Sequence, residues 1–298
     1  MSGFVASIGA KLAERWLAAL VLPGVVFVAA LVVAVRLGHG HWADFGGLGD
    51  DVNRFAESPA ARSTGSVLLI AVGVVVGSVA AAAVAHALQH AVVRVWTAGW
   101  GRLGEPLVRR RRQRWTEAAT RHRTALREKA RAKRAGDETS LPDTAALAAA
   151  RDRIALTEPS LPTWIGDRML AVDARVRGAY DLDLGSAWPR LWLLLPEDAR
   201  TPVTEARTEF AAAARMGAWG TLYLLVGTVW WPAALIGAGT WLTAWWQGRA
   251  AMAKLAELVE AAVDLHAATL ATAIGHAPGG PFTPADGVTV TRVLRKGG

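Results

Sequence analysis

Two histidines one helical turn apart are the first residues in the sequence whose spacing could hold a metal ion. His86 and His90 stand at i and i+4 in an apolar segment, which places both imidazoles on one helix face, as zinc sites on helices require. A zinc site needs a third ligand, and no glutamate lies between the two histidines. The chain also has no cysteine to supply a thiolate. We therefore expect both histidines to face water or lipid headgroups, and we predict no metal site and no cofactor.

Two further pairs of ionisable residues do not form the patterns of known catalytic or metal sites. Asp181 and Asp183 supply too few oxygens for a calcium loop of the EF-hand type, so a turn is their expected role. Asp264 and His266 are two residues apart on a predicted helix, so their side chains point to different faces. The sequence contains no Walker A motif, no G-x-S-x-G and no H-E-x-x-H. We predict that the protein is not an enzyme, and we assign no catalytic residue.

The arginine cluster RRRRQR stands out in a chain whose formal net charge is +8. It lies in a polar, helix-prone segment, residues 101–135. It could mark the cytoplasmic side of a membrane protein on a solvated helix, bind anionic lipid headgroups, or bind nucleic acid. Nucleic acid is not expected, because no helix-turn-helix or aromatic platform accompanies the charge. The residues assigned to lipid or partner binding are Arg109, Arg110, Arg111, Arg112 and Arg114.

A membrane-embedded fold is expected to position these residues, because the chain is 52% hydrophobic and holds 14 tryptophans. Leu17 to Val35 carries no charge and covers about 28 Å as a helix; a cleaved signal peptide is the rival interpretation. Ser66 to Val93 is the second predicted span. Its Gly73 and Gly77 predict close helix packing, either within the chain or between copies in a homo-oligomer. Ahead of the first span, an apolar stripe predicts a short helix on the membrane surface: Phe4, Ile8, Leu12 and Trp16.

The segment from Met216 to Gly248 is uncharged and too long for a single straight span. Pro232 lies at its middle, where it would end one helix and open the next. We predict a hairpin of two spans, about 211–231 and 232–250; a single tilted or re-entrant span is the alternative. Basic residues concentrate after the second span, whereas the loop 36–65 is slightly acidic. Both termini and the middle segment are therefore predicted to be cytoplasmic.

The stretch WPRLWLLLP, residues 188–196, looks like the start of a span but is too short to cross a bilayer. Its apolar residues recur at helical spacing, so a short helix is expected. We predict that Trp188 and Trp192 anchor the cytoplasmic module by packing against the helix of Met169 to Val176, or against the membrane surface. Farther on, Thr283 is expected to cap a short final helix.

Several stretches between residues 162 and 296 resemble an uncharacterised actinobacterial family of multi-pass membrane proteins. They are YDLD (180–183), WPRLW (188–192), the Trp-Trp-Pro of the predicted hairpin, and ELVEAAVDLH (257–266). The family has no established activity. The resemblance therefore implies an architecture and supplies no catalytic or ligand-binding residue.

Together these features predict an all-α integral membrane protein with four transmembrane helices in two hairpins and a helical cytoplasmic module. We expect a non-enzymatic protein of the plasma (inner) membrane that acts as a scaffold or signalling component through its cytoplasmic helices. The alternative is an oligomeric pore-forming or membrane-disrupting effector. Expected partners are the bilayer with its anionic headgroups, a cytoplasmic protein and further copies of the chain, without nucleic acid. The predicted segments are 1–100 (surface helix and first hairpin), 101–210 (basic cytoplasmic module), 211–250 (second hairpin) and 251–298 (cytoplasmic helix and tail).

Overall fold

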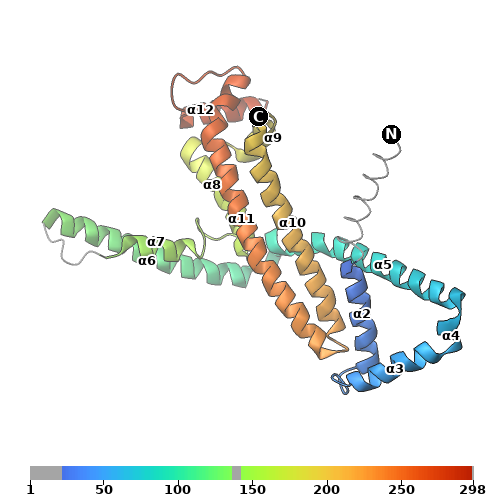
Figure 1. The fold of residues 1–298 in the computed structure, drawn as a ribbon. Coiled ribbons are helices and arrows are strands. Elements are labelled where there is room, and N and C mark those ends of the chain that lie inside the picture. Colours follow the sequence, from blue (N-terminus) through green and yellow to red (C-terminus); the bar gives the residue numbers. More distant parts are fainter. Residues whose placement is uncertain (1–21, 136–141, 297–298) are drawn as a thin grey trace, which may run out of the picture. The chain divides into compact units, whose positions relative to one another are not determined.

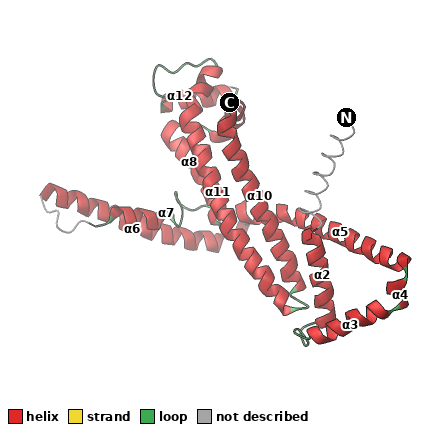
Figure 2. Cartoon of the chain, viewed as in Figure 1, coloured by secondary structure: helices red, strands yellow, loops and turns green. Residues whose placement is uncertain are grey.

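The computed structural model describes residues 22–135 and 142–296. All the regular secondary structure in these residues is helical (Figures 1 and 2). The predicted all-α class is confirmed for these residues. The predicted surface stripe from Phe4 to Trp16 and the start of the span from Leu17 lie outside the described residues. The elements are α2 (Leu22–Leu37), α3 (Phe45–Glu57), α4 (Pro59–Arg62), α5 (Thr64–Thr97), the 3₁₀ turn η2 (Gly101–Leu103), α6 (Glu105–Ala135), α7 (Thr144–Asp152), α8 (Trp164–Tyr180), α9 (Leu184–Leu194), α10 (Glu197–Val226), α11 (Trp231–Ala273) and α12 (Pro284–Leu294).

The contacts within the chain divide it into two compact units. The first unit comprises Met1–Val92 and Ala211–Trp246, and the second comprises Val93–Phe210 and Gln247–Gly298. The helices α5, α10 and α11 contribute residues to both.

One described helix, α5, is both long and apolar enough to cross a membrane. Only 11% of its most apolar window is buried in the protein, so most of that surface is open to its surroundings. Helix α2 is apolar, but its described part is 16 residues long. Helices α10 and α11 have the length, but neither is apolar enough over a span-length window to qualify. The structure thus has one qualifying helix among its described residues, against four spans expected from the sequence.

The uncharged segment 216–248 folds as a helical hairpin, and its residues up to Trp246 belong to the first unit. Helix α10 ends at Val226, a turn follows, and α11 begins at Trp231. Pro232 lies in the first turn of α11, where its missing N–H costs no helical hydrogen bond. The two helices approach closely, since a Cβ on Gly237 would lie 2.7 Å from the backbone nitrogen of Leu224. The predicted hairpin is therefore present, with its turn a few residues earlier than expected.

The segment 36–65, expected to be a loop, contains two helices. Asp44 caps α3 by accepting a hydrogen bond from the backbone N–H of Gly47 at 2.9 Å. Asp51 on α3 accepts from Arg36 at 2.7 Å and from Arg54 at 2.5 Å. The sequence does carry a signal for α3, because Leu48, Val52 and Phe55 recur at i, i+4 and i+7 and form one apolar face.

The second unit has its core between α8, α9, α12 and the parts of α10 and α11 that belong to it. Val172 and Val176 of α8, Leu191 of α9 and Val290 of α12 are each no more than 1% exposed. Thr283 caps α12 as predicted, and Asp286 returns a hydrogen bond to the Thr283 backbone, which completes a capping box. At this end of the unit α12 packs on α8 and α9.

Candidate functional site

The predicted arginine cluster lies on the first turns of α6, and the structure separates its members into two groups. Arg111 is largely buried and forms an ion pair at 2.5 Å with Asp167, whose side chain is 6% exposed. Arg112 pairs with Glu158 at 2.8 Å on the surface. The other three arginines, Arg109, Arg110 and Arg114, are exposed and form no ion pair within the described part of the chain.

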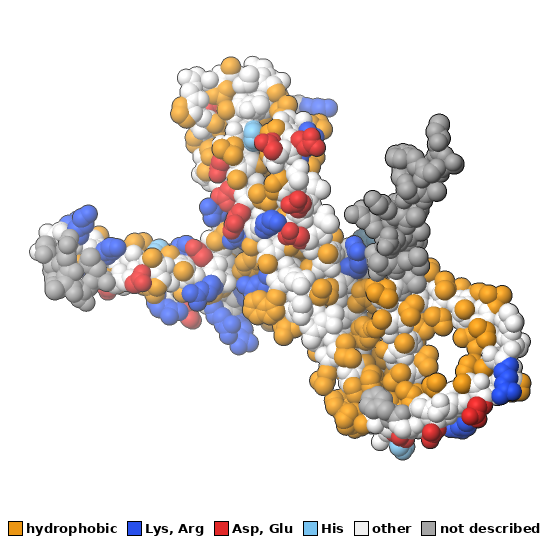
Figure 3. Space-filling model, in the orientation of Figure 1, with side chains coloured by type: hydrophobic (Ala, Val, Ile, Leu, Met, Phe, Trp, Pro, Cys, Tyr) orange, Lys and Arg blue, Asp and Glu red, His pale blue; other side chains and the backbone are white. Residues whose placement is uncertain are grey.

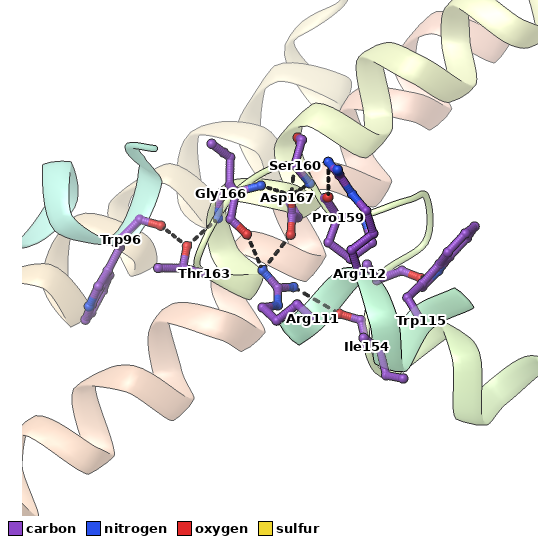
Figure 4. A network of polar contacts seen from close by, with 12 residues as sticks. Trp96, Arg111, Arg112, Trp115, Ile154, Pro159, Ser160, Thr163, Gly166 and Asp167 are labelled. Carbon is purple, nitrogen blue, oxygen red and sulfur yellow. Dashed lines mark hydrogen bonds and ion pairs between the residues drawn. The ribbon is translucent and has the colours of Figure 1, made fainter. Parts of the chain in front are cut away.

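Asp167 is the centre of a buried polar network between α6, α8 and the segment 153–163 (Figure 4). One of its carboxylate oxygens accepts the backbone N–H groups of Ser160 at 2.9 Å and Leu161 at 2.8 Å. The other faces the Arg111 guanidinium, which also donates to the carbonyls of Leu161 and Ile154 at 2.7 and 3.1 Å. Paired and hydrogen-bonded in this way, both charges can be removed from water.

Neighbouring residues fasten the same segment to the helices on either side. Trp115 donates its indole N–H to the Ala155 carbonyl at 2.9 Å, and Arg112 donates to the Pro159 carbonyl at 3.3 Å. Thr163 caps α8 by accepting the backbone N–H of Gly166, while its hydroxyl donates to the carbonyl of Trp96 (Figure 4). The carbonyls of this non-helical segment therefore accept hydrogen bonds from side chains of α6, and its N–H groups donate to Asp167 of α8.

Sequence reasoning placed Arg111 on a lipid or partner surface and did not single out Asp167. The two residues are 56 positions apart, and no local pattern links them. The one available signal was Thr163 before a helix with an acid in its first turn, which predicts a cap and not a buried ion pair. The structure places Arg111 in a buried ion pair with Asp167 and Arg112 in a surface ion pair with Glu158, both within the second unit.

Trp188 and Trp192 lie on α9, and both are half-buried. The fully buried residues of that helix are Ala187 and Leu191, with Leu195 just beyond its end, so the core-facing stripe lies one position away from the tryptophans. The two indole rings lie 5.9 Å apart. The guanidinium of Arg207 on α10 lies 6.0 Å from the Trp188 ring and 5.3 Å from the Trp192 ring, within cation–π distance.

These three side chains, which we call the Trp–Arg cluster (Trp188, Trp192 and Arg207), border two surface depressions. Trp188 and Arg207 line a cleft of about 380 Å³ between α8, α9, α10 and α11, whose other walls are largely apolar. Trp192 lines an open groove along the polar face of α10, from Glu197 to Glu209. Tryptophan and arginine are the residues most often found at the energetic centres of protein interfaces.

Gly73 and Gly77 lie on α5, in the first unit, and differ in their surroundings. A Cβ on Gly77 would lie 3.5 Å from the side chain of Val28 on α2, whereas one on Gly73 would meet nothing within 4 Å. The helices α2 and α5 approach more closely at Gly24, where a Cβ would lie 2.5 Å from the Ser78 carbonyl oxygen. Gly77 thus contributes to packing within the chain, and Gly73 is open.

The ionisable pairs considered for chemistry have structural contacts. The rings of His86 and His90 meet edge to face with centroids 5.4 Å apart, and the described residues contain no cluster of three potential metal ligands. Asp264 accepts a hydrogen bond from the Tyr180 hydroxyl at 2.9 Å, and this bond raises the tyrosine pKa. Asp183 pairs with Arg295 at 2.9 Å and so ties α9 to the end of α12.

His276 and Asp286 form a further pair beside the cap of α12, with 2.7 Å between the imidazole nitrogen and the carboxylate oxygen. The hydroxyl of Thr283 and then His276 lower the pKa of Asp286 to about 2.

No protein-family model, curated protein or solved structure matches this chain. This agrees with the resemblance noted in the sequence, which connects the chain to no known activity.

Proposed function

We propose that this chain is a non-enzymatic, multi-pass protein of the plasma (inner) membrane whose second unit serves as a cytoplasmic scaffold for a protein partner. In this proposal α2, α5 and the α10–α11 hairpin supply four spans, and both termini lie in the cytoplasm. The apolar, open surface of α5 supports a membrane location. The absence of charge from 216 to 248 and the arginines that follow α5 support the additional spans and the orientation.

The observation that carries the scaffold function is the Trp–Arg cluster with its two adjoining depressions. Arg207 is exposed and forms no ion pair within the described residues, while Trp188 and Trp192 keep part of their rings at the surface. A partner side chain entering the apolar cleft would cover the exposed part of the Trp188 ring next to the Arg207 guanidinium. The Arg111–Asp167 network supports the same role, because it fixes α6 and α8 as a rigid base.

Site-specific photocrosslinking in cells tests the scaffold proposal. Leu193, beside the cluster, is 76% exposed, and Leu265 on α11 of the same unit is 75% exposed, so the two form a matched pair of crosslinker positions. We expect position 193 to capture a cytoplasmic protein that position 265 does not, and Arg207→Ala to reduce that product about tenfold. Identical products at both positions, or a product at 193 that is indifferent to Arg207→Ala, would contradict the proposal.

A pore-forming or membrane-disrupting oligomer is the second candidate, and the open position of Gly73 favours it. A Cβ on Gly73 would meet nothing within 4 Å, and small residues allow helices to associate in lipid. Dye release from liposomes that contain the protein tests this alternative. Release that is abolished by Gly73→Leu would support a pore, whereas liposomes that stay sealed at high protein density would exclude it.

A further inference from the structure

The second half of α6 carries a row of arginines on one face. Arg123, Arg127, Arg131 and Arg134 follow one another at spacings of four, four and three residues, so they form one stripe along the helix. All four side chains are exposed, and none of them forms an ion pair within the described part of the chain. We call this row the arginine stripe.

The arginine stripe lies away from the packed side of α6. Helix α7 packs along α6, and the buried residues of α6 are Ala118, Ala119 and Ala125. At about 3.6 residues per turn, Arg127 and Arg134 fall on the side opposite Ala118 and Ala125. In Figure 3 lysine and arginine side chains gather over this helix. The stripe is therefore available to a binding partner from outside the two-helix pair.

Electrostatics within the helix disfavours this arrangement. Like charges three or four residues apart on a helix repel one another, and the stripe contains three such consecutive pairs. Glu128 is the one acidic residue among positions 121–135, and it forms no ion pair in the described structure. A phosphate-bearing surface would offset this repulsion, because each guanidinium can donate two parallel hydrogen bonds to phosphate oxygens.

We infer that the arginine stripe binds the phosphates of anionic lipid headgroups. Helix α6 begins at Glu105, eight residues after α5 ends at Thr97, so a membrane that holds α5 lies within reach of the same chain at high effective concentration. Nucleic acid has the same phosphates, but the stripe has no aromatic side chain for base stacking; its neighbours on this face are Thr116 and Thr120. The inference rests on the proposed membrane location, and it moves the lipid contact away from Arg111 and Arg112.

Energy transfer in nanodiscs tests this inference on the full-length chain. Because the native sequence has no cysteine, Thr120→Cys provides a single labelling position on the stripe side of α6, and Ala150→Cys provides one on α7. Acceptor dyes on the lipid headgroups then report docking of each position. We expect strong transfer from position 120 and weaker transfer from position 150 when the disc contains phosphatidylglycerol, and loss of the difference in phosphatidylcholine alone.

Charge neutralisation assigns the effect to particular residues. Replacing all four stripe arginines with glutamine should lower the docked-to-undocked ratio about 600-fold, because each basic residue near an anionic surface contributes roughly fivefold. A control variant with the same change of net charge elsewhere in the second unit should change the docked-to-undocked ratio less than about twofold, because only basic residues near the anionic surface contribute. Its substitutions are Arg153→Gln, Arg190→Gln, Arg292→Gln and Lys296→Gln.

Three results would overturn the inference: equal transfer in neutral and anionic discs, no effect of the stripe variant, or an equal effect of the control variant. A stripe variant that docks normally but loses affinity for a short DNA duplex would assign the stripe to nucleic acid instead. Failure of the chain to insert into discs at all would contradict the proposed membrane function. An inserted chain that does not dock would contradict the lipid inference alone.

Discussion

Removing the charge of Asp167 should open the segment 153–163 without unfolding the second unit. In Asp167→Asn the amide oxygen can still accept the N–H groups of Ser160 and Leu161, but Arg111 is left without its counter-charge. Breaking a buried ion pair by removing one partner costs about 3–5 kcal/mol. Arg111 is 18% exposed and keeps two carbonyl acceptors, so we expect the lower end, about 3 kcal/mol.

The assay is the rate of thiol labelling at Ala155→Cys, a position that is 4% exposed inside the segment. A loss of about 3 kcal/mol against local opening should raise that rate about 100-fold, since each 1.4 kcal/mol is a factor of ten. Ala206→Cys, 0% exposed in α10 of the same unit, is the matched control and should keep its rate. An unchanged rate at position 155 would refute the role of the ion pair. An equal rise at both positions would show that the pair stabilises the whole unit.

Three further predictions concern α9 and α12. A Cβ at Gly287 would overlap a backbone carbonyl of α8, so Gly287→Ala should lower stability by about 1–3 kcal/mol in denaturant titration; unchanged stability would contradict the packing of α12. Leu191→Ala, at a fully buried position, should lower the free energy of unfolding by about 2–5 kcal/mol. Trp192→Ala should lower it clearly less in the same titration, because Trp192 is half-buried. A larger loss for Trp192→Ala than for Leu191→Ala would make Trp192 the anchor. The capping threonine and then His276 lower the pKa of Asp286 to about 2, so its contribution is present above about pH 4, where the unfolded carboxyl ionises, and lost as pH falls towards 2. Urea titrations of Asp286→Asn and the native chain should therefore differ at neutral pH and converge in strong acid.

Elements set by local patterns could be predicted from the sequence. The helix at WPRLWLLLP, the hairpin around Pro232 and the Thr283 cap each depend on residues within a few positions of one another. Which face of such a helix is buried depends on tertiary packing. The core face of α9 is centred on Leu191 and not on Trp188 and Trp192, because α8 and α12 pack against that face.

The polar network could not be predicted, for a physical reason. Arg111 looked like any member of an arginine run, and only the fold brings Asp167 to it across 56 positions. Likewise, the sequence showed Gly73 and Gly77 as an equivalent pair, while the structure uses Gly77 and leaves Gly73 open. The number of spans is the remaining difference, since α5 alone among the described helices is both long and apolar enough to cross a membrane.

Topology mapping by thiol accessibility tests the proposed membrane topology most directly. In that topology the second unit lies in the cytoplasm, and the tip of the α10–α11 hairpin lies on the other side of the membrane. Three exposed positions serve as single-cysteine sites in the cysteine-free chain: His41→Cys, Thr120→Cys and Thr228→Cys. A membrane-impermeant maleimide added to intact cells should label positions 41 and 228, and should label position 120 only after permeabilisation. Labelling of positions 120 and 228 from the same side would contradict the account.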